Sequence, residues 1–154
     1  MGHGIDYATL PKGQGLRIGV VAARWNGFVV EPMFEQALVT LQQCGATPVV
    51  VRVPGAFELP VAAKRLAHAV DAVIAMGAVI RGDTPHFDFV AGEAARGLQE
   101  VAVATGLPVI FGVLTTNTQE QAEERADPLR ANKGREFALS AIETVLALQD
   151  HPRT

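Results

Sequence analysis

The sequence predicts a three-layer α/β fold in which a parallel sheet of four strands is covered by helices on both faces. Apolar runs rich in Ile and Val alternate with segments of helical periodicity along the 154 residues. The runs are apolar on both faces, which is typical of strands buried between two layers of helices. Each run is followed by a helical segment, as the crossover connections of a parallel sheet require.

Four apolar runs are the predicted strands. They span Leu16 to Ala23, Thr47 to Val53, Ala72 to Ile80 and Leu107 to Leu114. Pro54 and Gly55 end the second run, because proline cannot donate a ladder hydrogen bond and glycine favours turns.

Helical periodicity fills the intervals between the strands. Apolar residues recur at helical spacing from Phe34 to a stop at Gly45, from Leu59 to Val70, from Phe87 to Val101, and from Phe137 to Leu148. Thr118 opens a further short helix, and Gln121 stands where a capping box needs it.

The composition favours one domain over residues 1–154, with residues 1–15 as a Gly-rich N-terminal arm. The arm lacks the basic and apolar regions of a signal peptide, and no run is long and apolar enough for a membrane span. The net charge is -3 and the basic residues are scattered, which argues against a nucleic-acid surface. Cys44 is the only cysteine, so an internal disulfide is impossible and a cytoplasmic location is expected.

Ligands of open parallel sheets bind beyond the carboxyl ends of the strands. The informative segments are therefore the loops that follow the predicted strands. These loops cover residues 24–27, 54–58, 81–87 and 115–118.

The loop after the third strand could bind an anion. Thr84 is suited to the N-cap and Pro85 to the first position of the following helix, whose free N–H groups would attract a phosphate. His86 would stand beside that anion and could transfer protons. Asp83 would repel a phosphate unless a cation such as Arg81 intervenes. The alternative is an ordinary helix start with an exposed histidine.

Two other loops carry candidate ligand contacts. Trp25 is the only tryptophan, and a flat heteroaromatic ring could stack on it, although it could equally cap the core. Gly55 permits a close backbone approach, and Glu58 could accept hydrogen bonds from a polyol or an amino group. The alternative for Glu58 is a favourable place in a helical first turn.

A run of mixed charge late in the chain is usually a solvated helix face. Arg125 within it could nevertheless hold a phosphate through two hydrogen bonds, and Lys133 after the helix-capping Asn132 could reach an anion. The sequence has no phosphate-binding loop of the Walker type, no dinucleotide fingerprint, no nucleophile-elbow serine and no metal-ligand spacing.

Several motifs at these loops resemble those of the lumazine synthase family over Arg17 to Leu148. The motifs are Arg24-Trp25-Asn26, residues 54–60, residues 77–87, residues 111–116, and Asn132-Lys133-Gly134 after Glu124-Arg125-Ala126. Each motif is moderately specific, and their common order and spacing is highly specific. The resemblance implies a flavodoxin-like domain and an enzyme that uses neither a cofactor nor a metal.

The resemblance also implies contacts to a ribitylaminouracil. Trp25 would stack on the pyrimidine, Ala56 and Glu58 would contact the ribityl chain, and Val79 and Ile80 would offer backbone groups to the uracil. Two further substrate contacts are expected within the same motifs, at Asn26 and Phe57.

For the second substrate, 3,4-dihydroxy-2-butanone 4-phosphate, the resemblance implies a phosphate-binding turn at Asp83 and Thr84. Arg125 would bind the phosphate, and His86 would transfer protons. Two positions match residues that reach the site from a neighbouring subunit, namely Phe111 and Lys133.

The implied reaction condenses the two substrates, through a Schiff base, into 6,7-dimethyl-8-ribityllumazine with loss of phosphate and water. It is the penultimate step of riboflavin biosynthesis. The implied assembly is a homo-oligomer built on a pentamer. Pro128 departs from the glycine-rich run of shell-forming members and favours a pentamer or small assembly.

The alternatives are a non-catalytic flavin- or lumazine-binding protein and a shell-forming protein on the same scaffold. The joint presence of His86, Arg125 and Lys133 favours the enzyme. A phospho-acceptor signalling domain is disfavoured, because Arg24 and Trp25 stand where its acidic cluster is expected.

Overall fold

The computed structural model describes residues 7–154, so residues 1–6 of the predicted arm lie outside the described residues. The described residues form four strands and five α-helices around one sheet. The strands are β1 (Arg17–Ala23), β2 (Thr47–Val53), β3 (Ala72–Ile80) and β4 (Val109–Thr116). The helices are α1 (Gly27–Gln43), α2 (Leu59–Leu66), α3 (His86–Thr105), α4 (Gln119–Ala126) and α5 (Lys133–Leu148).

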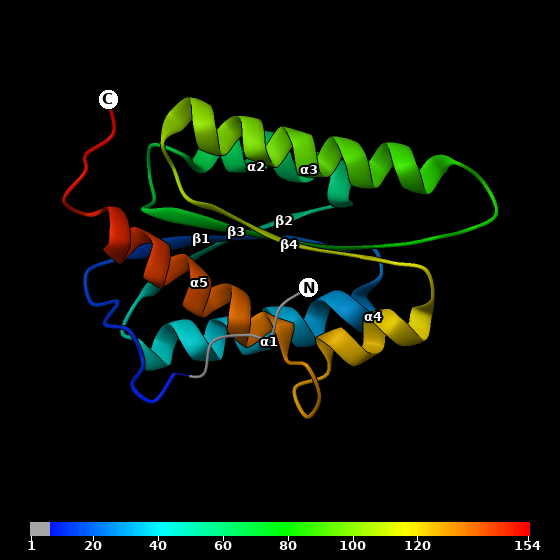
Figure 1. The fold of residues 1–154 in the computed structure, drawn as a ribbon, viewed down its shortest axis with the longest axis horizontal. Coiled ribbons are helices and arrows are strands. Elements are labelled where there is room, and N and C mark those ends of the chain that lie inside the picture. Colours follow the sequence, from blue (N-terminus) through cyan, green and yellow to red (C-terminus); the bar gives the residue numbers. More distant parts are fainter. Residues whose placement is uncertain (1–6) are drawn as a thin grey trace.

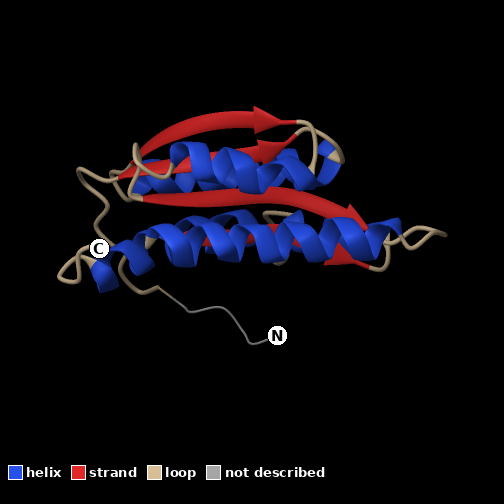
Figure 2. Ribbon diagram, turned by 90° about the horizontal axis from the view of Figure 1, so that it is seen from above, coloured by secondary structure: helices blue, strands red, loops and turns tan. Residues whose placement is uncertain are grey.

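The sheet is entirely parallel, with strand order β2-β1-β3-β4. Helices α2 and α3 cover one face, and α1, α4 and α5 cover the other (Figure 1). The strand arrows point the same way in Figure 2, as the parallel pairing requires, so the loops that follow the strands gather at one end of the sheet. The predicted three-layer fold with a four-stranded parallel sheet is therefore confirmed.

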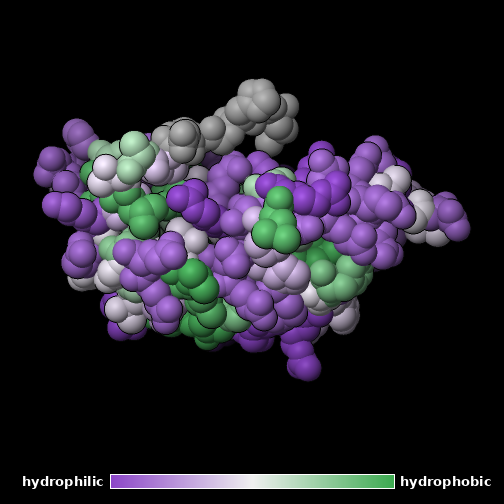
Figure 3. Space-filling model, turned by 90° about the horizontal axis from the view of Figure 1, so that it is seen from below, coloured by the Kyte–Doolittle hydropathy of each residue, from purple (hydrophilic) through white to green (hydrophobic). Residues whose placement is uncertain are grey.

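Two hydrophobic cores lie on opposite faces of the sheet. Val20 and Ile74 pack toward α1 and α5, whereas Val21 and Val73 pack toward α2 and α3. This alternation follows from the strand period of two residues. The outer face of α1, α4 and α5 is mainly hydrophilic, with hydrophobic residues in small separate patches (Figure 3). The apolar sides of these helices are thus buried in the core.

Helix α1 begins at Gly27, well before the predicted start near Phe34. Pro32 lies inside this helix and cannot donate a backbone hydrogen bond, which is why the sequence pattern concealed the first turns. The helix tolerates the lost bond because Val29 and Met33 on either side of the proline are completely buried. Packing therefore overrides local propensity here.

Strand β4 lies two residues later than predicted. Leu107 donates its backbone N–H to the hydroxyl of Thr105 at 3.1 Å, and Pro108 has no N–H, so neither residue donates to the ladder. Thr115 and Thr116 pair with the end of β3, so the first two residues of the predicted loop 115–118 belong to the strand. Helix α2 is also shorter than predicted and ends at Leu66.

The described part of the N-terminal arm lies against the α1 and α5 side of the molecule. Tyr7 and Leu10 pack on the core there, and the Tyr7 hydroxyl donates a hydrogen bond to Glu143. Burial, reinforced by the hydrogen bond to Glu143, raises the pKa of Tyr7 to about 12. Gly13 donates its N–H to the carbonyl of Cys44 at 2.7 Å, so the arm also holds the end of α1.

Candidate active site

A cavity of about 500 Å³ opens at the carboxyl ends of β1, β2 and β3. The chain runs from β1 to β2 on one side and later to β3 on the other, so the strand order reverses at β1. Such switch points are the usual ligand sites of open parallel sheets. The residues that line the cavity are Ala23, Trp25, Asn26, Gly55, Ala56, Phe57, Glu58, Ala78, Val79, Ile80, His86, Phe89 and Val90.

The loop after β1 is tied to both neighbouring strands. The backbone N–H of Trp25 donates to the carbonyl of Pro54 at 2.9 Å, which joins this loop to the loop after β2. Asn26 adopts a left-handed conformation with φ 57, and its side-chain amide donates to the carbonyl of Ala78 on β3 at 2.8 Å. Trp25 is 66% exposed, so its ring is held at the cavity rather than in the core.

Glu58 ends a short 3-10 helix, Ala56–Glu58, that follows β2. One oxygen of its carboxylate accepts the N–H of Gly55 at 2.9 Å. Glu58 therefore does occupy a helical turn, which was the alternative to ligand binding that the sequence left open. Because this bond uses one carboxylate oxygen, the second remains available to a ligand, and the two roles are compatible.

His86 lies at the start of α3 and lines the cavity. The predicted capping of this helix is wrong by one residue, since Pro85 occupies the N-cap and His86 begins the helix. The hydroxyl of Thr84 instead accepts the N–H of His86 at 3.4 Å. The Asp88 N–H bonds to the Pro85 carbonyl, a tight turn that places the helix start one residue later.

Sequence reasoning missed Phe89 and Val90 as cavity residues. They follow His86 by three and four positions on α3, and residues at that spacing share one helix face. Phe89 is 68% exposed, and the cavity lining thus contains three exposed aromatic residues, Trp25, Phe57 and Phe89. The spacing from His86 was the signal that could have identified these residues.

Among the predicted site residues, the structure brings Trp25, Asn26, Ala56, Phe57, Glu58, Val79, Ile80 and His86 to the cavity. The predicted residues that do not line it are Asp83, Thr84, Phe111, Arg125 and Lys133. Asp83 and Thr84 are exposed in the loop directly before His86, so they remain next to the cavity in sequence.

Comparison with known proteins decides the family. Residues 15–149 match the family described as 6,7-dimethyl-8-ribityllumazine synthase. A protein named 6,7-dimethyl-8-ribityllumazine synthase from Thermobifida fusca is 55% identical over 139 residues, covering 88% of this chain and 82% of the relative. One of the same name from Kineococcus radiotolerans is 54% identical over 141 residues, covering 89% of this chain and 88% of the relative. The chain belongs to the 6,7-dimethyl-8-ribityllumazine synthase family.

In this lumazine synthase chain, Arg125 and Lys133 lie on α4 and α5, which cover the sheet face opposite α3 (Figure 1). A guanidinium nitrogen of Arg125 donates to the carbonyl of Gln121 at 3.1 Å. The Lys133 ammonium bonds both carboxylate oxygens of Glu136, at 3.0 and 3.1 Å. Within one chain, these two cations are therefore separated from the cavity by the sheet.

Phe111 lies on the edge strand β4 and is 38% exposed. It pairs with Ala75, three residues before the cavity-lining Ala78 on β3. At about 3.3 Å per residue, that offset places Phe111 roughly 10 Å from the end of the sheet where the cavity opens.

The cavity of a single lumazine synthase chain has no lysine or arginine among the lining residues that the structure describes. Arg81 follows β3 directly, but Asn117 accepts its side-chain N–H at 3.0 Å and its guanidinium lies over the ring of Phe87 at 4.3 Å. An ion pair with Asp88 at 3.6 Å also holds it. Arg81 thus ties the start of α3 to the loop after β4.

In residues 7–154, no helix is long and apolar enough to cross a membrane. The same residues contain no group of three or more His, Cys, Asp or Glu side chains placed to hold a metal ion.

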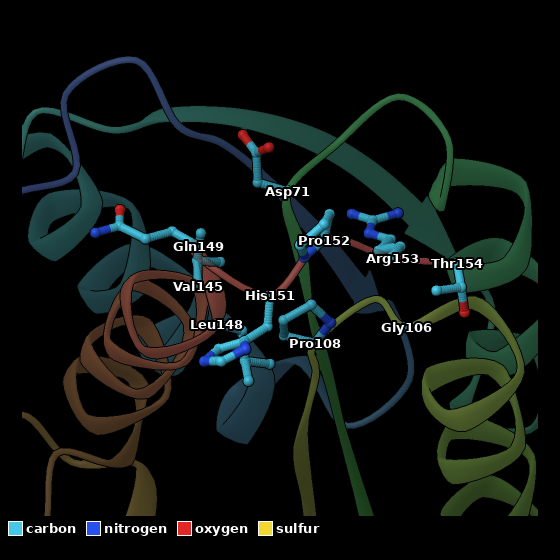
Figure 4. Close-up of a pocket in the computed structure, with 10 residues that line it drawn as sticks. All are labelled: Asp71, Gly106, Pro108, Val145, Leu148, Gln149, His151, Pro152, Arg153 and Thr154. Atoms are coloured by element: carbon cyan, nitrogen blue, oxygen red, sulfur yellow. The ribbon is translucent and has the colours of Figure 1, made fainter.

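A second cavity, of about 420 Å³, lies at the opposite end of the sheet, where residues before β3 and β4 meet the C-terminal tail (Figure 4). Arg153 in this tail donates to the carbonyls of Ala67 and Val70, at 2.9 and 3.1 Å. The lining of this second cavity combines one acidic residue, Asp71, with tail residues that include His151. Through these two bonds of Arg153, the C-terminal tail acts as a clasp that binds the connection between α2 and β3.

We expect Arg153→Ala to lower the free energy of unfolding by about 1 kcal/mol or less, because two hydrogen bonds at the surface are lost. The kcat and KM of the lumazine synthase reaction should not change, since the clasp and the first cavity lie at opposite ends of the sheet. Chemical denaturation and steady-state kinetics measure the two effects. A changed KM for either substrate would contradict the assignment of the active site to the first cavity.

Proposed function

We propose that this chain condenses 5-amino-6-(D-ribitylamino)uracil with 3,4-dihydroxy-2-butanone 4-phosphate in the cavity at the carboxyl ends of β1, β2 and β3. The products are 6,7-dimethyl-8-ribityllumazine, phosphate and water. The observation that carries the proposal is that Trp25 and His86 line the same cavity. A stacking surface and a proton-transferring group are thus available to one bound ring.

The pyrimidine binds beside Trp25, with the backbone of Val79 and Ile80 facing its polar edge. This placement is supported by the position of all three residues in the cavity lining. The ribityl chain runs toward Ala56 and Glu58, where the second carboxylate oxygen of Glu58 accepts hydrogen bonds from hydroxyl groups. Two further contacts to this substrate are proposed from the lining, at Asn26 and Phe57.

The phosphate of the second substrate binds near Asp83 and Thr84, at the start of α3. Free N–H groups and the positive end of the helix dipole favour an anion there. The acidic Asp83 opposes this, and the described cavity lining contains no lysine or arginine. Arg81, two residues before Asp83, is held by Asn117, Phe87 and Asp88, so a cation from outside the single chain is proposed to neutralise the phosphate.

A neighbouring copy of the chain supplies that cation. Arg125 and Lys133 are the proposed contributors, together with the ring of Phe111 on the exposed edge of β4. The proposed assembly is a homo-oligomer built on a pentamer, with each site between adjacent subunits.

Catalysis requires mainly that the two substrates are held in position next to each other. The exposed amine of the uracil condenses with the ketone to a Schiff base and releases one water, phosphate is eliminated, and ring closure by the ribitylamino nitrogen onto the remaining carbonyl releases a second water. Holding two reactants together replaces a large entropic barrier, and His86 moves the protons that each step requires. The proposal needs neither a metal nor a cofactor. We further propose that residues 1–154 act as one domain in the cytoplasm, where a free thiol such as that of Cys44 stays reduced.

The direct test mixes the purified protein with both substrates and follows lumazine fluorescence and phosphate release. Equal amounts of lumazine and phosphate are expected. Binding of lumazine without its formation would instead favour a non-catalytic flavin- or lumazine-binding protein.

We expect Arg125→Ala to raise the KM for the phosphorylated substrate roughly tenfold or more, because a charged hydrogen bond to phosphate is lost. The KM for the pyrimidine should stay the same. Steady-state kinetics with each substrate varied in turn measure the two constants.

The control for Arg125→Ala tests whether two subunits share each site. In oligomers formed from Arg125→Ala chains mixed with His86→Ala chains, some sites combine an intact His86 with an intact Arg125. At concentrations of the phosphorylated substrate well below its KM, activity above that of either variant alone is therefore expected. No gain in well-mixed oligomers would contradict the proposed contribution of Arg125 to a neighbour's site.

A further inference from the structure

The ring of Trp25 lies directly on Gly55. A Cβ atom added at Gly55 would stand 2.4 Å from Cε3 and 2.6 Å from Cζ3 of the indole. Carbon atoms in van der Waals contact are about 3.5–4.0 Å apart, so no side chain fits between the two residues. The indole therefore rests on the bare backbone of Gly55.

Backbone conformation does not explain the glycine at this position. Gly55 has φ -143 and ψ -177, an extended conformation that any residue adopts without strain. What position 55 requires is the absence of a side chain. An alanine there changes the contact with Trp25 and leaves the backbone unstrained.

Hydrogen bonds fix both the ring and the surface on which it rests. The N–H of Gly55 donates to Glu58 at 2.9 Å, which holds the peptide under the indole. The N–H of Trp25 donates to the carbonyl of Pro54 at 2.9 Å, which holds the backbone that carries the ring. The position of the indole relative to Val79 and Ile80, which line the same cavity, thus depends on the contact with Gly55.

We propose that Gly55 is a positioning residue that seats the Trp25 ring and so sets the gap into which the flat ring of the pyrimidine substrate slides. The identity of that ring rests on the proposed function. Any side chain at position 55 displaces the indole and changes the gap. Glu58 contributes to the same seat by holding the Gly55 peptide, in addition to any contact with the ribityl chain.

We expect Gly55→Ala to weaken binding of 6,7-dimethyl-8-ribityllumazine about tenfold or more, because stacking requires the ring in one place. The KM for the pyrimidine should rise similarly, and the KM for the phosphorylated substrate should stay the same. Stability should change little, because the indole is 66% exposed and can turn toward water without opening the core. Calorimetric titration with lumazine, kinetics and thermal unfolding measure these effects.

Two controls separate the seat from other effects. Gly27→Ala lies two residues after Trp25, at the start of α1, but its Cβ meets only Cγ of Glu31, at 3.8 Å, so binding should not change. In a Trp25→Ala background, Gly55→Ala should cause no additional loss of affinity, because the ring that it displaces is absent. Trp25 is the only tryptophan, so its emission in Gly55→Ala should shift relative to the unaltered protein.

Three results would overturn the proposal. They are unchanged lumazine affinity in Gly55→Ala, unchanged tryptophan emission in Gly55→Ala, or a loss of lumazine affinity from Gly55→Ala that is as large in the Trp25→Ala background as in the unaltered protein. The last result would mean that Gly55 acts on the ligand without Trp25. If the unaltered protein neither forms nor binds lumazine, the proposed function fails instead. The emission shift would still report the contact between Gly55 and Trp25.

Discussion

We expect His86→Ala to lower kcat about a hundredfold or more while leaving measurable activity. His86 is the one titratable imidazole in the described cavity lining, so its loss removes the proposed proton transfer. The pocket for the pyrimidine is unchanged, and proximity of the two substrates still accelerates the reaction. Steady-state kinetics at saturating concentrations of both substrates measure the effect.

His151→Ala is the matched control, because His151 lines the second cavity at the opposite end of the sheet. This variant should retain the kcat and both KM values of the unaltered protein. Complete inactivity of folded His86→Ala would contradict a mechanism that depends mainly on positioning. A kcat unchanged by His86→Ala would remove the proton-transfer role.

The second large effect is expected for Gly134→Ala, where the first turn of α5 crosses α1. A Cβ atom at Gly134 would stand 2.2 Å from the carbonyl oxygen of Met33 and 2.7 Å from its Cα. Both are backbone atoms, so no side-chain rotation can relieve the overlap, and α5 must move away from α1. We expect a loss of about 3 kcal/mol in the free energy of unfolding, at the upper end of overpacking costs. Chemical denaturation measures it.

Gly92→Ala in α3 is the control, because nothing lies within 4 Å of a Cβ atom at that position. Replacing an exposed helical glycine should leave stability unchanged or raise it by roughly 0.5–1 kcal/mol. Equal denaturation midpoints for Gly134→Ala and the unaltered protein would contradict the close crossing. Because Lys133 precedes Gly134, the displaced helix should also raise the KM for the phosphorylated substrate.

The local pattern of the sequence was sufficient to predict the strands and the order of the helices. Buried strands leave continuous apolar runs, and β1 and β3 are both nearly fully buried. The boundaries were less predictable where two local preferences conflict. Pro32 concealed the first turns of α1. The N-cap of α3 is Pro85 and not Thr84, because the Pro85 carbonyl accepts the N–H of Asp88 while the Thr84 hydroxyl accepts the N–H of His86.

The candidate site was predictable to the extent that it lies in loops after strands. Trp25, Glu58 and His86 were all found this way, because parallel strands deliver their following loops to one edge of the sheet. Phe89 was missed because it lies inside a helix, one turn beyond the loop. The seat of Trp25 on Gly55 was also out of reach, because it depends on a contact between two loops separated along the chain.

The sequence by itself determined the class of fold, the loops after β1, β2 and β3 that line the cavity and, through its motifs, the family. Only the tertiary structure decided that the strands run in the order β2-β1-β3-β4, which places the loops of β1, β2 and β3 around one cavity. It also decided that Arg125 and Lys133 lie on helices across the sheet from α3. The reason is that periodicity shows which side of an element is buried, whereas its neighbours depend on how all the buried surfaces pack together.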